Sequence, residues 1–120
     1  MSAPKIFESE YRFCLILWDN EPIGSGRLVQ LAREGLGWSK ATTYTVIRRL
    51  AERGVLKNEN TIVTSLISKE EAQKSRLEDL VEETFQGSMP AFIAAFSKSK
   101  KMTRQEVDQL KALIDSFEEA

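Results

Sequence analysis

The sequence predicts a mainly α-helical fold with one small β-hairpin, arranged as a winged helix-turn-helix followed by a helical arm. Apolar positions recur at helical spacing in the stretch 39–53 and again in three stretches after residue 68. Between them lie two β-rich runs, 55–58 and 61–66, separated by Glu59-Asn60 as a short turn. The order of helices and hairpin is that of a winged helix. We therefore expect residues 1–67 to form that domain and residues 68–120 to form the arm.

Two helices are expected before the stretch 39–53. The first covers residues 10–18 and contains the single cysteine, Cys14, which we interpret as a small buried core residue. The second runs from a Ser25 cap to about Arg33, and residues 34–37, Glu-Gly-Leu-Gly, follow as a tight connector. The residues of this second helix that we expect to face inward are Leu28, Val29 and Ala32.

The stretch 39–53 is the most informative helix. Ser39 is a suitable N-cap and Gly54 a suitable left-handed stop. The residues predicted to be buried are Thr43, Val46, Ile47 and Leu50, and those predicted to face outward are Ala41, Thr42, Thr45, Arg48 and Arg49.

The outward face of this helix has the chemistry of a DNA reader. Small hydroxyl and methyl groups suit base edges, whereas arginines reach guanines or phosphates. We interpret Trp38 as a core anchor that sets the entry angle of the helix. The candidate DNA-binding residues are Ser39, Lys40, Ala41, Thr42, Tyr44, Thr45, Arg48 and Arg49.

Charge is unevenly distributed along the chain. The net charge is −1, but residues 22–60 carry seven Lys and Arg against three acids, and residues 68–120 carry eight basic against eleven acidic residues. A basic reader joined to an acidic appendage is typical of a DNA-binding domain with a separate partner-binding part. Because the basic excess is modest, we expect two readers to act together on DNA.

Composition argues against several other classes. With no histidine and one cysteine, a transition-metal site or a nucleophile–histidine pair is almost excluded, so we expect no cofactor and no enzyme. No apolar run approaches the length of a membrane span, and no signal-peptide pattern is present. We expect a cytoplasmic protein without membrane insertion.

The arm is predicted to contain three helices. Ser68 and Glu71 form a capping box for a helix that Gln86-Gly87 ends, Ser88 caps a short apolar helix, and Thr103 caps the last one. These helices carry more apolar surface than a thin arm can bury alone, which favours a homodimer over an arm folded back on its own winged helix. The candidate interface residues are Leu77, Leu80, Phe92, Ile93, Phe96, Leu110, Ile114 and Phe117.

The order of elements carries a family resemblance. The helix from Glu10-Tyr11 to Leu17-Trp18, the Trp38-Ser39 entry, the run from Arg49-Leu50 to Arg53-Gly54-Val55-Leu56 and the acidic helical tail resemble the penicillinase repressor (BlaI/MecI/CopY) family. The resemblance implies a homodimeric repressor of an inverted-repeat operator in double-stranded DNA. It also implies DNA contacts from the positions of Ala41, Thr42, Thr45 and Arg49, although the family often has Lys where this chain has Ala41, and the wing here is short with no basic residue at its tip.

The resemblance also bears on regulation. The chain lacks the C-terminal cysteine cluster of copper-responsive members, so copper sensing is not expected. In antibiotic-responsive members a sensor protease cleaves the short helix of the arm, and the matching bond here is Ala95-Phe96. The alternative is that Phe96 is only a core residue of the dimer interface. Two other classes remain open: a winged-helix regulator of another family, such as the PadR type, and a winged-helix protein-interaction module.

Overall fold

The computed structural model describes residues 3–99 and 101–116. In this part of the chain there are six helices and a three-stranded antiparallel sheet. The chain divides into two compact units, residues 1–77 and 78–120, and the division falls within a single helix, α4 (Lys69–Phe85). The predicted functional boundary at residues 67 and 68 coincides with the start of this helix and stays a prediction.

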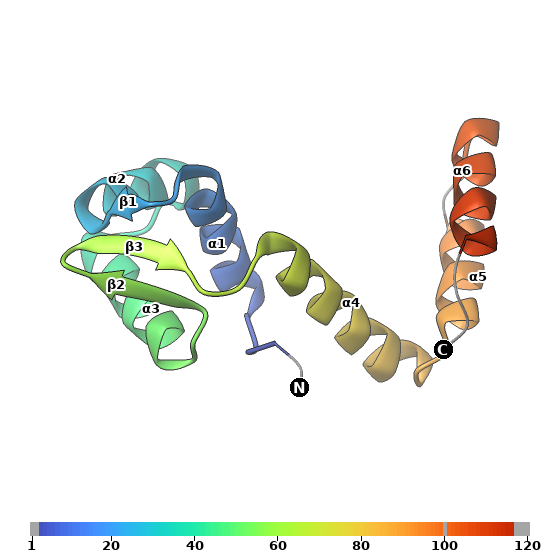
Figure 1. The fold of residues 1–120 in the computed structure, drawn as a ribbon, viewed down its shortest axis with the longest axis horizontal. Coiled ribbons are helices and arrows are strands. Elements are labelled where there is room, and N and C mark those ends of the chain that lie inside the picture. The colour runs from blue at the N-terminus through green and yellow to red at the C-terminus, as the bar shows by residue number, and fades with distance from the viewer. Residues whose placement is uncertain (1–2, 100, 117–120) are drawn as a thin grey trace. The chain divides into compact units, whose positions relative to one another are not determined.

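The first unit is a winged helix, as predicted (Figure 1). Its elements in chain order are α1 (Glu8–Asn20), β1 (Ile23–Gly24), α2 (Ser25–Leu36), α3 (Lys40–Glu52), β2 (Leu56–Glu59) and β3 (Ile62–Ser65). The three helices and the sheet enclose one apolar core, and its fully buried side chains include Phe13, Leu17, Leu28, Leu50, Leu56 and Val63.

The sheet has the order β1-β3-β2. The hairpin turn is Asn60-Thr61, one residue later than predicted, because Glu59 still pairs with Ile62 in the ladder. Both turn residues have positive φ, 53° and 63°, as the type I′ two-residue hairpin turn requires. The third strand, β1, was not predicted: it has two residues and is held by antiparallel pairing with β3.

The second helix differs from its predicted form at both ends. Ser25 is not the cap: Gly24 occupies that position without a side-chain hydrogen bond, and Ser25 is buried in the first turn. The helix continues to Leu36, which packs against the core, and ends at Gly37 with a left-handed φ of 71°. Apolar packing thus extends the helix through Gly35, and the connector shrinks to residues 37–39.

The interpretation of Cys14 as a core residue is confirmed. Its side chain is fully buried between α1 and the rest of the core. Burial raises the pKa of the thiol to about 12, and the negative charge of Glu10 contributes to the rise. The thiol is therefore neutral at physiological pH and behaves as a small apolar group.

The beginning of α4 packs on α1 within the first unit. The Trp18 indole donates a hydrogen bond of 3.1 Å to the carbonyl oxygen of Ile67, just before the helix. About two turns into α4, the Arg76 guanidinium lies 4.0 Å from the centre of the Tyr11 ring and pairs with Glu8. These contacts make the first turns of α4 part of the winged-helix core, which periodicity alone did not indicate.

The second unit contains the rest of α4, α5 (Met89–Ser99) and α6 (Arg104–Asp115). The predicted caps are confirmed: the Ser68 hydroxyl accepts from the backbone N–H of Glu71, and the Thr103 hydroxyl accepts from that of Glu106. Among the described residues, none of the helices combines the length and the apolar character needed to cross a membrane.

Candidate nucleic-acid interface

The candidate interface is built on α3, whose start is fixed by its cap. The Ser39 hydroxyl accepts a 3.1 Å hydrogen bond from the Thr42 backbone N–H and donates one of 3.0 Å to the Thr42 hydroxyl. The Thr43 hydroxyl is fully buried and donates to the Ser39 carbonyl oxygen at 2.9 Å. Capping therefore satisfies the polar groups that the helix start exposes.

The predicted division of α3 into two faces is confirmed. Thr43, Val46, Ile47 and Leu50 are the buried residues of this helix. Lys40, Ala41, Thr42, Arg48 and Arg49 are exposed, and Thr45 is half-buried between them. The structure brings the predicted site residues together on one outer face, because they share one side of a continuous helix.

Three cations on this face are unengaged. Within the described ranges, the side chains of Lys40, Arg48 and Arg49 make no hydrogen bond or ion pair with the protein. A guanidinium that has no protein partner keeps its five donors for an external acceptor such as a phosphate or a guanine edge. The outer face of α3 thus offers a cationic, donor-rich surface.

Tyr44 is held differently from the rest of the candidate set. The residue is 37% exposed, and its hydroxyl lies 3.3 Å from the Ser25 hydroxyl at the start of α2. The backbone N–H of Ser25 in turn donates to the Thr61 carbonyl oxygen in the wing turn at 2.7 Å. Tyr44 therefore lies where α3, α2 and the wing meet, with part of its ring open to solvent.

Trp38 packs as the predicted anchor before α3. Its ring stacks on Phe13 of α1, with centres 5.4 Å apart and planes inclined by 16°. The side chain is half-buried, so the anchor covers the edge of the core and does not fill its centre.

The wing contributes little positive charge. Lys57 on β2 lies 3.7 Å from the Glu59 carboxylate on the same strand, and both side chains are largely exposed. The turn itself is Asn60-Thr61, which carries no charge. A wing of this composition offers hydrogen bonds to DNA and weak electrostatic attraction.

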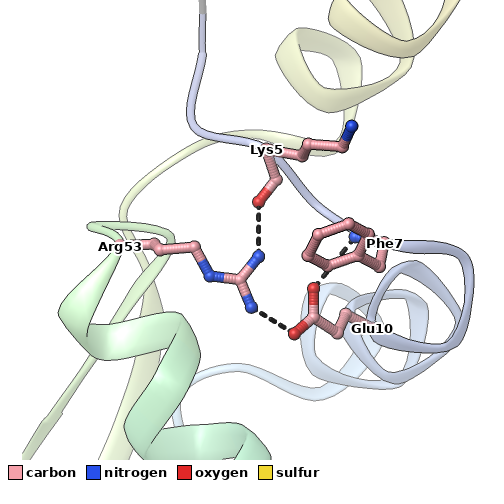
Figure 2. Close-up of polar contacts among 4 residues, drawn as sticks. All are labelled: Lys5, Phe7, Glu10 and Arg53. Atoms are coloured by element: carbon pink, nitrogen blue, oxygen red, sulfur yellow. Dashed lines mark hydrogen bonds and ion pairs between the residues drawn. The ribbon is translucent and has the colours of Figure 1, made fainter.

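One polar cluster at the C-terminal end of α3 was not predicted from the sequence (Figure 2). Arg53, the residue directly after α3, pairs with the Glu10 carboxylate and donates a 2.9 Å hydrogen bond to the Lys5 carbonyl oxygen. The other Glu10 oxygen accepts from the Phe7 backbone N–H at 2.9 Å. Glu10 and Arg53 are 43 residues apart, so no local sequence pattern indicates that they pair. The sequence shows only that Glu10 is an acid in the first turn of α1.

The described part of the chain offers no group of three or more side chains that could hold a metal ion. A three-helix core, a hairpin wing and an exposed cationic face on the helix after the turn define a winged-helix DNA-binding protein.

Comparison with known proteins gives the family. The penicillinase repressor family matches residues 6–116, nearly the whole chain, and the chain belongs to this family. It is accordingly a DNA-binding transcriptional repressor, in a family whose members are not enzymes. The family assignment replaces the PadR-type and interaction-module alternatives. A search of curated proteins found no match.

Proposed function

We propose that the protein is a homodimer that represses transcription by placing α3 of each subunit in the major groove of one half of an inverted-repeat operator. The observation that carries this proposal is the outer face of α3, where Arg48 and Arg49 are exposed without a protein partner. Ala41, Thr42 and Thr45 contact base edges, and Ser39, Lys40 and Tyr44 contact the backbone at the ends of this face.

The capped start of α3 suits this arrangement. On the outer face of its first two turns, Ala41 and Thr42 are exposed and Thr45 is half-buried, and these short side chains allow the helix backbone to approach the base pairs closely. The arginines follow on the next turn, with the length to reach a guanine or a phosphate. Ala41 has no polar group to offer a base edge, so Thr42, Thr45 and the two arginines provide the hydrogen bonds that distinguish the bases.

We propose that the arm forms the dimer interface, because the second unit leaves large apolar side chains exposed. Leu113 is 66% exposed and Ile114 60% exposed on α6, and Leu80 and Met89 are also open to solvent. An open groove of about 330 Å³ lies between α5 and α6, and Phe92, Ile93, Met102 and Leu110 are among its lining residues. Of the predicted interface residues, Phe117 lies outside the described residues.

The apolar excess of the arm calls for a partner surface. A monomer in water rarely leaves a contiguous apolar groove of this kind open, whereas a second arm would cover both the groove and the side chains around it. Linking two readers also raises operator affinity without any new contact, which offsets the modest positive charge of each reader.

We propose that the repressor is released from the operator when a sensor protease cleaves the Ala95-Phe96 bond. This bond lies in α5, and both residues are exposed. Cleavage would separate α6 from the remainder of the chain and so remove Leu113 and Ile114 from the dimer. Mass spectrometry of the protein from induced cells tests this step: a fragment ending at Ala95 is expected, and an intact chain under full derepression contradicts it.

Selection of bound sequences from a random DNA pool tests the function as a whole. We expect an inverted repeat with half-sites about one helical turn, or a multiple of it, apart. Binding to the recovered sequence should weaken steeply between low and high salt, because phosphate contacts release counterions. Recovery of a single unrepeated site would overturn the dimeric arrangement, and recovery of no preferred sequence would overturn operator recognition by α3.

A further inference from the structure

Arg53 stands out among the basic residues of the reader because its charge is already engaged. It follows α3 directly as the C-cap residue, three residues beyond the last core position of that helix, Leu50. Its side chain is 28% exposed, whereas Arg48 and Arg49 are exposed. Arg53 therefore caps the helix that carries the proposed contact residues, but its side chain is held by the protein itself.

The contacts of Arg53 engage both of its outer guanidinium nitrogens. One nitrogen donates to the Lys5 carbonyl oxygen at 2.9 Å and the other pairs with Glu10, while the guanidinium carbon lies 5.3 Å from the centre of the Phe7 ring (Figure 2). A planar guanidinium is suited to such two-point binding, which an ammonium group cannot reproduce. These contacts fix how far the Arg53 guanidinium lies from α1 and in which direction its side chain points.

Glu10 is the buried partner in this cluster. It is 7% exposed, and each carboxylate oxygen accepts a hydrogen bond, one from Arg53 and one from the Phe7 backbone N–H. It lies in the first turn of α1, where the helix dipole favours a negative charge, and Arg53 lies at the end of α3, where it favours a positive one. The pair thus joins the ends of two helices that the core already packs together.

We infer that Glu10 and Arg53 are positioning residues for the recognition helix, and that Arg53 does not contact DNA. The pair clamps the C-terminal end of α3 to the start of α1, while Ser39 caps the other end of α3. Both ends of the reading helix are then fixed before DNA arrives. This inference rests on the proposed use of α3 as the reading helix.

Two charge-neutralising variants separate positioning from DNA contact, because the alternatives predict different effects on random-DNA affinity, on the salt slope and on the ratio of operator affinity to random-DNA affinity. If Arg53 contacted a phosphate, Glu10→Gln would release it and strengthen binding to random DNA, and Arg53→Gln would lower the salt slope by about 1. If the pair positions α3, both variants lower the ratio of operator affinity to random-DNA affinity by about 5-fold to 100-fold, comparable with losing one base contact. The salt slope then stays at the wild-type value.

The double variant and a matched control complete the test. Glu10→Gln with Arg53→Gln should be no worse than the more severe single variant, because the two residues act as one unit. Arg104→Gln and Asp108→Asn remove the same charges from an exposed pair on α6 and should leave the affinity ratio unchanged. All comparisons are made at a temperature where circular dichroism shows each variant fully folded.

Arg53→Lys decides the matter if the neutral variants do not fold. It keeps the charge but loses the two-point geometry, so a positioning role predicts a reduced affinity ratio with an unchanged salt slope. Near-wild-type affinity and selectivity in Arg53→Lys would overturn the inference. Loss of binding in Arg49→Ala with no effect at Glu10 or Arg53 would leave the proposed function standing and reject the positioning role alone.

Discussion

Single side chains on α3 divide into those available to DNA and those engaged by the protein. Arg48 and Arg49 are exposed and, among the described residues, have no side-chain partner, whereas Arg53 is bound by Glu10 and Lys5. Equal formal charge in the sequence thus corresponds to different chemistry in the folded chain. The winged helix therefore has less positive charge available to bind phosphate than its number of Lys and Arg residues suggests.

Arg49→Ala should weaken operator binding by about 1 to 3 kcal/mol if the guanidinium contacts a base or phosphate directly. The fold should be unaffected, because the side chain is exposed on the outer face of the helix. Titration of labelled operator by fluorescence anisotropy measures the effect. Arg12→Ala on the exposed side of α1 serves as the control, and equal affinities for the two variants would remove Arg49 from the site.

Cys14 should make stability depend on pH in the alkaline range. Its folded pKa of about 12 lies above the ordinary thiol value of 9.0, so the unfolded chain loses the thiol proton first. The stabilising contribution is fully present below about pH 9 and is lost as pH rises toward 12, by up to about 1.4 kcal/mol per pH unit. Urea unfolding of wild type and Cys14→Ala at several pH values measures this difference, and parallel pH profiles would contradict it.

At the level of elements, α3 is defined by its two ends as much as by its apolar stripe. Ser39 caps the start, and Gly54 adopts a left-handed φ of 81° after the last turn. Before the cap, Trp38 stacks on Phe13 and sets where the connector between α2 and α3 meets the core.

Trp38→Ala should lower the free energy of unfolding by about 2 to 4 kcal/mol, somewhat less than for a fully buried tryptophan because the ring is half-buried. Operator binding should fall only with the folded fraction. Chemical denaturation and DNA titration on the same preparation distinguish the two quantities. A stable variant with weak binding would assign Trp38 to the DNA contact surface.

Local rules explain which elements could be predicted. The caps at Ser39, Ser68 and Thr103 form hydrogen bonds with residues three positions away, so their pattern is visible in the sequence. β1 has only two residues, and its stability comes from pairing with a strand about forty residues later, which leaves no periodic signal.

Long-range chemistry explains what could not be predicted at the site. The outer face of α3 follows from helical spacing, and the structure places the predicted residues on that one side of the helix. The Glu10–Arg53 pair joins the ends of two helices, and the hydroxyl contact of Tyr44 depends on how α2 packs against α3. Such contacts arise from tertiary packing, and the DNA contacts themselves stay predictions.

For the whole molecule, the boundary between the two packing units shows where the chain can be truncated to test DNA reading apart from dimerisation. The first turns of α4 belong to the winged-helix unit, since Ala72 is buried and Arg76 packs on Tyr11. A chain ending at Leu77 keeps these contacts, whereas a chain ending at Ser68 loses them.

The chain ending at Leu77 should fold as a winged helix, sediment as a monomer and bind the operator about 100-fold to 10,000-fold more weakly than the full chain. The loss arises because the second half-site encounter is no longer intramolecular. The chain ending at Ser68 should be less stable than the longer one. A dimeric 1–77 fragment in analytical ultracentrifugation would place the interface in the winged helix.

Ile114→Asp should produce monomers without unfolding either unit. The side chain is 60% exposed on α6, so the charge is solvated in the monomer but would be buried without a partner in the proposed interface. Gln105→Asp places the same charge on an exposed polar position of that helix and should leave the dimer intact. Identical sedimentation of the two variants would exclude Ile114 from the interface.

The turn at Asn60-Thr61 limits how the wing can change in length. Tips of surface hairpins usually accept extra residues easily. Here the Thr61 carbonyl oxygen receives the backbone N–H of Ser25, whose hydroxyl in turn meets that of Tyr44 on α3. A residue inserted at this tip would displace an acceptor needed at the start of α2, and the disturbance would reach the reading helix. The length of the wing in this chain is therefore tied to the packing of α2 and α3, and substitutions of its exposed side chains should disturb the domain less than an insertion at the tip.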